Sequence, residues 1–238
     1  MRGSLALVGS GEYLPEMAEL EKSLIQDGLN HGKANKFIQI PTAAGRESKD
    51  RLEFWRELGA RQASLIGTEQ IFLPIFDRES ANSHEYADLI SDGALIYMSG
   101  GDPHFLAETL TGTPVWKAII KNWHSGGSLA GCSAGAMVMS SEIPNFRILK
   151  HGPTAGLDVI GNIRVIPHFN KFFKWIPDAA AKVLLHAPQG SILLGVDEVT
   201  ALVQRSGSDY WEVCGQANVH VLQGAPTEQL AAGRTIRF

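Results

Sequence analysis

The sequence predicts an α/β fold, a three-layer sandwich whose sheet is mostly parallel and has an antiparallel C-terminal edge. Up to about residue 200, short continuous apolar runs alternate with stretches of helical periodicity, as in parallel sheets covered by helices on both faces. Beyond that point, short runs of β-type residues separated by turns are typical of antiparallel hairpins. No linker, repeat or low-complexity segment interrupts the chain, so residues 1–238 are expected to form a single domain.

The predicted strands are apolar runs bounded by glycine, proline or polar turn residues. In chain order they are Leu5–Val8, Phe37–Ile40, Ala63–Ile66, Ile71–Pro74, Ala94–Met98, the run that ends at Cys132, Ile163–Ile166, Ser191–Val196, Ala201–Val203, Tyr210–Val213 and Val219–Leu222. The last three form the antiparallel tail.

The predicted helices have apolar residues three and four positions apart, and two open near a proline. In chain order they are Pro15–Leu29, Glu47–Leu58, His84–Ile90, Phe105–Leu110, Val115–Trp123, Ala134–Ser140 and Pro177–His186. Gly59 is expected to stop the second helix. The segment Ser141–Gly161 is rich in proline and glycine, and we expect an irregular loop of the kind that often carries function.

Composition excludes several classes of function. The net charge of −4 and the absence of a Lys/Arg run give no electrostatic case for nucleic acid or an anionic membrane surface. No apolar run reaches the ~20 residues that a bilayer span needs. Only Cys132 and Cys214 occur, without a zinc-type spacing, and Gly9-x-Gly11 lacks the third glycine of a dinucleotide site. No metal or cofactor is therefore predicted, and a cytoplasmic location is the default expectation.

The segment 128–137 contains Gly131-x-Ser133-x-Gly135, the nucleophile-elbow pattern. An apolar run precedes Ser133 and a helix-compatible run follows it, so the serine is expected on a sharp strand-to-helix turn. Side chains at the two glycine positions would collide with such a turn. The alternative is a glycine-rich structural turn with a buried serine. The strand-before, helix-after context favours a catalytic Ser133.

Polar residues follow several predicted strands at the point where each ends. They are Glu12, Gly100-Gly101-Asp102, Ser133, His168 and Glu198. Ligands of open α/β sheets bind beyond the carboxyl ends of the strands, so these residues are expected to surround one crevice. A nucleophilic serine needs a base within hydrogen-bond reach and a third group that orients the base. The cluster supplies candidates for both.

His168 is the predicted base because it stands at a strand end. His151 lies in the irregular loop and is the main competitor. His186 ends a predicted helix, where a cation interacts favourably with the helix dipole, and His220 alternates within a β-run, so both are expected to be structural.

Two acids are candidates for orienting His168. Glu198 stands at a strand end, and Asp197 beside it faces the other way if the chain is still extended. Asp158, in the irregular loop, is the alternative. The order Ser133, Asp158, His168 would match α/β-hydrolases, in which the acid precedes the histidine, whereas Glu198 would follow it.

A family resemblance favours Glu198. The segments 129–136, 99–102, 167–169 and 195–203 together resemble the peptidase E (aspartyl dipeptidase) and cyanophycinase family of serine peptidases, and the likeness covers most of the chain. The resemblance implies a class I glutamine amidotransferase-like fold and a triad of Ser133, His168 and Glu198. It also implies that the Gly101 and Ala134 N–H groups form the oxyanion hole. Gly100, Asp102 and Lys171 are then substrate-binding candidates.

The sequence departs from the cyanophycinase pattern beside the base. Those enzymes typically carry Asp-Gln before the histidine and several arginines after it, where this chain has Ile166-Pro167 and the segment 170–174. Hydrolysis of cyanophycin is therefore not expected. A preference for an acidic first residue remains open, because Lys171 or Lys174 can attract a carboxylate, although a solvated surface position is slightly favoured for both lysines.

The predicted function is a metal-independent serine peptidase, dipeptidase-like, that hydrolyses short peptides through an acyl-enzyme. One alternative is a catalytically silent binding or regulatory protein of the same fold. Another is an esterase or amidase that acts on a non-peptide substrate. Glutamine amidotransferase chemistry is disfavoured because Ser133, rather than Cys132, holds the centre of the elbow. The predicted partner is a small peptide substrate, and a homodimer is left open.

Overall fold

The computed structural model describes residues 1–144, 154–175 and 187–238. Its main sheet has eight strands in the order β14-β11-β10-β1-β5-β4-β2-β3. These strands are β1 (Leu5–Val8), β2 (Ala34–Ile40), β3 (Glu69–Phe72), β4 (Gly93–Met98), β5 (Ser128–Cys132), β10 (Thr200–Gln204), β11 (Trp211–Gly215) and β14 (Thr235–Ile236). The five strands from β1 to β3 in this order are parallel, and β10, β11 and β14 add an antiparallel edge. The predicted fold class is confirmed.

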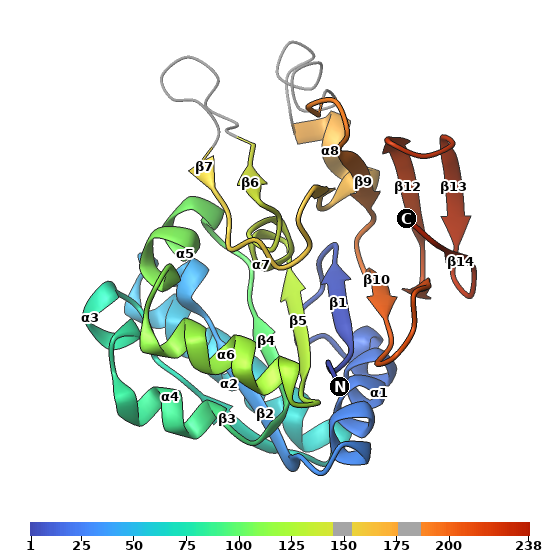
Figure 1. The fold of residues 1–238 in the computed structure, drawn as a ribbon. Helices are drawn as coiled ribbons and strands as arrows, with labels where there is room; N and C mark the ends of the chain where they lie inside the picture. Colours follow the sequence, from blue (N-terminus) through green and yellow to red (C-terminus); the bar gives the residue numbers. More distant parts are fainter. Residues whose placement is uncertain (145–153, 176–186) are drawn as a thin grey trace.

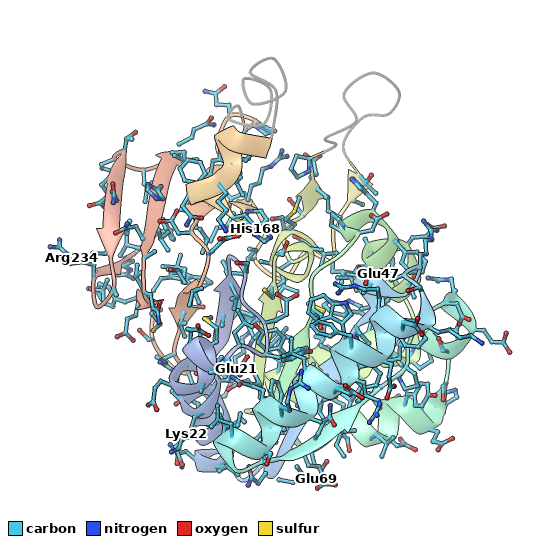
Figure 2. All side chains as sticks on the ribbon, turned by 180° about the vertical axis from the view of Figure 1, so that it is seen from behind. Glu21, Lys22, Glu47, Glu69, His168 and Arg234 are labelled. Atoms are coloured by element: carbon cyan, nitrogen blue, oxygen red, sulfur yellow. The ribbon has the colours of Figure 1, made fainter. Side chains whose placement is uncertain are left out.

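Helices cover both faces of this sheet, which gives the three layers. Helices α1 (Ala18–Asn30) and α2 (Lys49–Ile66) lie on the face seen in Figure 2. The other face carries α3 (Arg78–Ala81), α4 (His84–Ile90), α5 (Pro103–Leu110) and α6 (Pro114–His124) (Figure 1). Alternation along β1 serves both layers, because Leu5 and Leu7 pack in the core with α6 while Ala6 and Val8 pack in the core with α1. A strand buried on both faces reads as a continuous apolar run, as β1 does.

Helix α2 differs from the prediction. It runs through Gly59 to Ile66, so the expected strand at residues 63–66 is wrong, and β3 begins two residues before the expected run at Ile71. The helix stops at Gly67, which adopts the left-handed conformation with φ of 74°. Gly59 serves close packing instead: a Cβ there would lie 2.1 Å from Gln39 Oε1, and Gln39 Nε2 donates to the Gly59 carbonyl.

A second sheet was not predicted. Its order is β13-β12-β9-β8, with β8 (Ile163–Ile166) parallel to β9 (Ile192–Val196). Strand β12 (Asn218–Gln223) pairs antiparallel with β9 and with β13 (Glu228–Ala231). The last run of the expected tail therefore belongs to this sheet and not to the edge of the main one. Since β8 and β9 are parallel neighbours, their carboxyl ends lie side by side.

Short elements complete the described chain. They are the 3₁₀ turns η1 (Pro15–Met17) and η2 (Thr42–Ala44), the helices α7 (Ala134–Met137) and α8 (Phe169–Trp175), and the hairpin of β6 (Glu142–Ile143) with β7 (Thr154–Ala155). Helix α7 ends three residues before the expected Ser140. The expected helix at residues 177–186 lies outside the described residues. Within the described ranges, no helix has the length and apolar character needed to cross a bilayer.

Candidate active site

Ser133 stands at the turn between β5 and α7, two neighbouring elements in Figure 1, and it contacts Val8 at the carboxyl end of β1. Its backbone has φ of 50° and ψ of −109°, a conformation that costs an L-residue roughly 1–3 kcal/mol. Hydrogen bonds hold the turn on both sides: Ser133 N–H donates to Val8 O at 2.9 Å, and the Ala136 and Met137 N–H groups donate to Ser133 O at 3.0 Å. The expected sharp strand-to-helix turn is present at Ser133.

The two flanking glycines are required by close backbone approach, as expected. A Cβ on Gly131 would lie 2.3 Å from Gly135 O, and a Cβ on Gly135 would lie 2.3 Å from Met98 O. Both distances are too short for any side chain. The strand, the turn and the first turn of α7 therefore pack against one another only because these positions lack a Cβ.

His168 follows β8 and directly precedes α8, and its backbone also has a positive φ, 52°. Its Nε2 lies 3.1 Å from Ser133 Oγ, so the main sheet supplies the serine and the second sheet the histidine. The ring is half exposed, and Figure 2 shows His168 well above Glu69, the first residue of the parallel strand β3. Of the competing bases, His151 and His186 lie outside the described residues.

Glu198 follows β9 and completes the chain of side-chain contacts. Its Oε1 lies 3.0 Å from His168 Nδ1, and its Oε2 forms an ion pair with Lys171. Asn170 fixes the backbone there, because its Oδ1 accepts from Glu198 N–H at 3.2 Å. Burial raises the pKa of the Glu198 carboxyl, but hydrogen bonds from Lys171 and His168 outweigh it, so the net pKa is lowered. The carboxylate is therefore held in its charged form.

The remaining acids of the prediction lie elsewhere. Asp197 points away from His168, as expected for an extended chain, and its Oδ1 contacts His220 Nε2 at 3.0 Å. His220 is thus a pairing residue of the second sheet. Asp158 adopts a positive φ of 53°, and its N–H donates to Ser140 O. Among the described residues, Glu198 and not Asp158 contacts the His168 ring.

Two backbone donors face the region beside Ser133. The N–H groups of Gly101 and Ala134 have no hydrogen-bond partner among the described residues, and both residues line the same pocket as Ser133. Gly101 follows β4 with φ of 139°, and a Cβ there would lie 2.3 Å from Ala43 O. The Asp102 side chain caps α5 by accepting from the His104 N–H at 2.9 Å, so its carboxylate has a structural partner.

A pocket of about 400 Å³ opens beside these groups, a size in the usual range for small-ligand sites. Its polar lining includes Ser133, His168, Lys171 and Glu198, and its apolar lining includes Pro103, Met137, Ile166, Pro167 and Phe172. Gly100 is not among the lining residues, and the Lys174 side chain lies outside the described part. Nowhere in the described chain do three or more His, Cys, Asp or Glu side chains gather as a metal site would need.

Cys132 lies under the elbow and is fully buried. Burial, reinforced by the negative charge of Glu12, raises the pKa of its thiol well above the usual value. A thiol that stays protonated is a poor nucleophile. The neighbouring Ser133, with a histidine in reach, is the group of this turn that can be activated.

The sequence profile described as peptidase family S51 matches residues 5–209, most of the chain. The chain belongs to peptidase family S51. This membership makes it a serine-type hydrolase of peptide bonds, as the sequence predicted.

Individual relatives agree with the S51 assignment. A cyanophycinase of Geminocystis herdmanii is 28% identical over 207 residues, which cover 81% of this chain and 71% of that protein. The crystal structure of a peptidase from an acI-B1 Actinobacterium has a TM-score of 0.97 and 63% identity, covering 100% of this chain and 98% of that one. The crystal structure of a Listeria monocytogenes protein described as a peptidase E has a TM-score of 0.66 at 17% identity, covering 91% of this chain and all of that one. At this identity the likeness supports the fold alone.

Proposed function

We propose that Ser133, His168 and Glu198 form the catalytic triad of a peptidase that hydrolyses short peptides through an acyl-enzyme. The observation that supports the proposal is the unbroken path of two contacts, 3.1 Å from Ser133 Oγ to His168 Nε2 and 3.0 Å from His168 Nδ1 to Glu198 Oε1. It has the geometry of nucleophile, base and orienting acid.

In this mechanism the Ser133 hydroxyl attacks the scissile carbonyl carbon while His168 Nε2 takes its proton. Glu198 keeps the proton of His168 on Nδ1 and stabilises the imidazolium that forms. The N–H groups of Gly101 and Ala134 donate to the developing oxyanion. His168 then protonates the leaving amine, and water, deprotonated by the same ring, releases the acyl group from Ser133.

The pocket favours an uncharged side chain next to the scissile bond. Much of its lining is apolar, and its cation, Lys171, is already paired with Glu198. An acidic first residue would have to compete with Glu198 for that ammonium group. We therefore propose dipeptides or short peptides with an apolar first residue as substrates, and preference for an acidic one is the competing outcome.

Cyanophycin is a second candidate because curated relatives of this chain are named cyanophycinases. The pocket wall beside His168 weighs against it: Ile166 and Pro167 are apolar where those enzymes typically carry Asp-Gln. A polymer with charged side chains would lie against this apolar wall without polar partners there.

The test is a panel of dipeptides with one common second residue and Leu, Met, Ala, Asp or Lys as the first, together with cyanophycin. We expect release of free amino acids from the Leu and Met members at the highest kcat/KM, and none with a folded Ser133→Ala variant. Fastest turnover of the Asp member or of cyanophycin would overturn the proposed specificity. Activity that survives in Ser133→Ala would overturn the proposed nucleophile.

A further inference from the structure

Glu12 lies between the Gly100–Gly101 turn and the elbow at Ser133, and it does not line the pocket of the proposed active site. It follows β1, and each oxygen of its carboxylate contacts a different element. Glu12 Oε1 accepts from the Gly100 N–H at 2.9 Å, and Glu12 Oε2 accepts from the Cys132 thiol at 3.0 Å. Each partner immediately precedes a residue of the proposed machinery, since Gly101 follows Gly100 and Ser133 follows Cys132.

The contact with Gly100 helps to set the direction of the Gly101 N–H. That N–H belongs to the peptide between Gly100 and Gly101, and this peptide lies between two anchored donors. Glu12 holds the Gly100 N–H on one side, and Ala43 O accepts from the Asp102 N–H at 2.8 Å on the other. Among the described residues the Gly100 N–H has no other acceptor. Without Glu12 the peptide is anchored at one end only.

Packing places this anchor against the nucleophile. A Cβ on Gly100 would lie 2.8 Å from Glu12 Oε1 and 3.3 Å from Ser133 Cβ. Gly100 is therefore packed between the Glu12 carboxylate and Ser133. A shift of Glu12 would therefore move the Gly100–Gly101 turn relative to Ser133. Oxyanion donors act only at about 2.7–3.1 Å from the oxyanion, so a small displacement has a large effect on rate.

We propose that Glu12 is a positioning residue that ties the Gly100–Gly101 turn to the elbow and so fixes the oxyanion hole around Ser133. This inference rests on the proposed function. The role requires a side chain that accepts from the Gly100 N–H at one end and contacts Cys132 at the other, and not the charge as such. Gln meets this requirement because its amide oxygen can accept from the Gly100 N–H while its amide N–H donates to the Cys132 sulfur, a weak acceptor whose own S–H then turns away. A negative charge near the oxyanion would also oppose its formation, so the neutral isostere should serve nearly as well as the carboxylate.

The test compares Glu12→Ala, Glu12→Asp and Glu12→Gln with wild type, and Glu16→Ala serves as a control because Glu16 is exposed four residues further on. We expect kcat to fall about 10- to 100-fold in the Ala and Asp variants, with KM changed less than about threefold, because removing one oxyanion donor outright costs 10²–10³. The Asp carboxylate is one methylene too short to bridge both partners. Glu12→Gln should keep kcat within about threefold of wild type, as should Glu16→Ala.

The relative kcat values of the three Glu12 variants distinguish a positioning role from a role of the charge. If Asp retains activity and Gln loses it, Glu12 acts through its charge, and the positioning role is refuted. If all three fold and keep kcat, Glu12 is structural only, and the role is likewise refuted. If Glu12→Ala does not fold, the Asp and Gln pair still gives the answer. The proposed function is judged separately, by the difference between wild type and Ser133→Ala.

Discussion

Glu21 is a buried carboxyl group in the first turn of α1, and it makes the stability of the fold depend on pH. Its side chain has no exposed surface, and Figure 2 shows it on α1 below His168. Its Oε2 accepts from Gln62 Nε2 at 2.6 Å, and its Oε1 accepts from Tyr13 N–H at 3.4 Å. Burial raises the pKa of the Glu21 carboxyl from 4.5 to about 8, against the lowering effect of these two hydrogen bonds.

The raised pKa of Glu21 determines both the direction and the size of the change in unfolding free energy with pH. Between pH 4.5 and about 8 the folded state keeps the Glu21 proton and the unfolded state does not. The free energy of unfolding therefore falls by roughly 1.4 kcal/mol per pH unit as pH rises, or about 5 kcal/mol over the window. Glu21→Gln removes this titration. Near pH 5 the variant should be about 1 kcal/mol less stable, because Gln offers an acceptor to one of the two donors.

Urea unfolding at pH 5, 6.5 and 8 measures the difference. We expect Glu21→Gln to change from slightly less stable than wild type to more stable by several kcal/mol as pH rises. Glu19→Gln, which removes an exposed carboxylate from the same helix, is the matched control because Glu19 lacks the burial of Glu21. A Glu21→Gln difference that stays constant from pH 5 to pH 8 would show that Glu21 ionises normally in the folded state, and would refute the reasoning.

Three further predictions concern the site. Glu198→Gln should lower kcat about 10³-fold by removing the orienting charge, and Asp158→Asn should stay within threefold of wild type in the same peptide assay; the reverse result would identify Asp158 as the acid. Gly101→Ala should abolish measurable turnover because the new Cβ collides with a backbone carbonyl, whereas Gly112→Ala, strained but with open space around it, should lower the melting temperature without changing kcat. Lys171→Met should lower kcat less than about tenfold and leave the ratio of acidic to neutral first residues unchanged, and loss of turnover of acidic substrates alone would show that Lys171 reads them.

The elbow could be predicted because its physical requirements are local. Glycines two residues on either side of Ser133 are needed wherever a strand turns this sharply, so the sequence pattern carries the geometry. His168 could be placed at a strand end because the apolar run before it, residues 163–166, is also a local pattern. The second sheet could not be predicted, because β8 and β9 are apolar runs that read alike whichever sheet they join.

Long-range contacts account for the other differences. Gly59 looks like a helix stop, and only its approach to Gln39 on β2 shows why a glycine is needed inside α2. Glu12 could be noted at a strand end, but its contacts with Gly100 and Cys132 span 88 and 120 residues of sequence. No local pattern encodes such a bridge, so its role emerges from the fold alone.

Activation of the Ser133 hydroxyl by His168 is the step on which the proposed peptidase chemistry depends. Its most direct test is labelling with a fluorophosphonate probe, followed by peptide mass mapping of the modified residue. We expect one adduct on Ser133 in the wild-type protein, much slower labelling in His168→Ala, and none in Ser133→Ala, with all three proteins folded. No adduct on folded wild-type protein, as a catalytically silent protein would give, or an adduct on another residue, would contradict it.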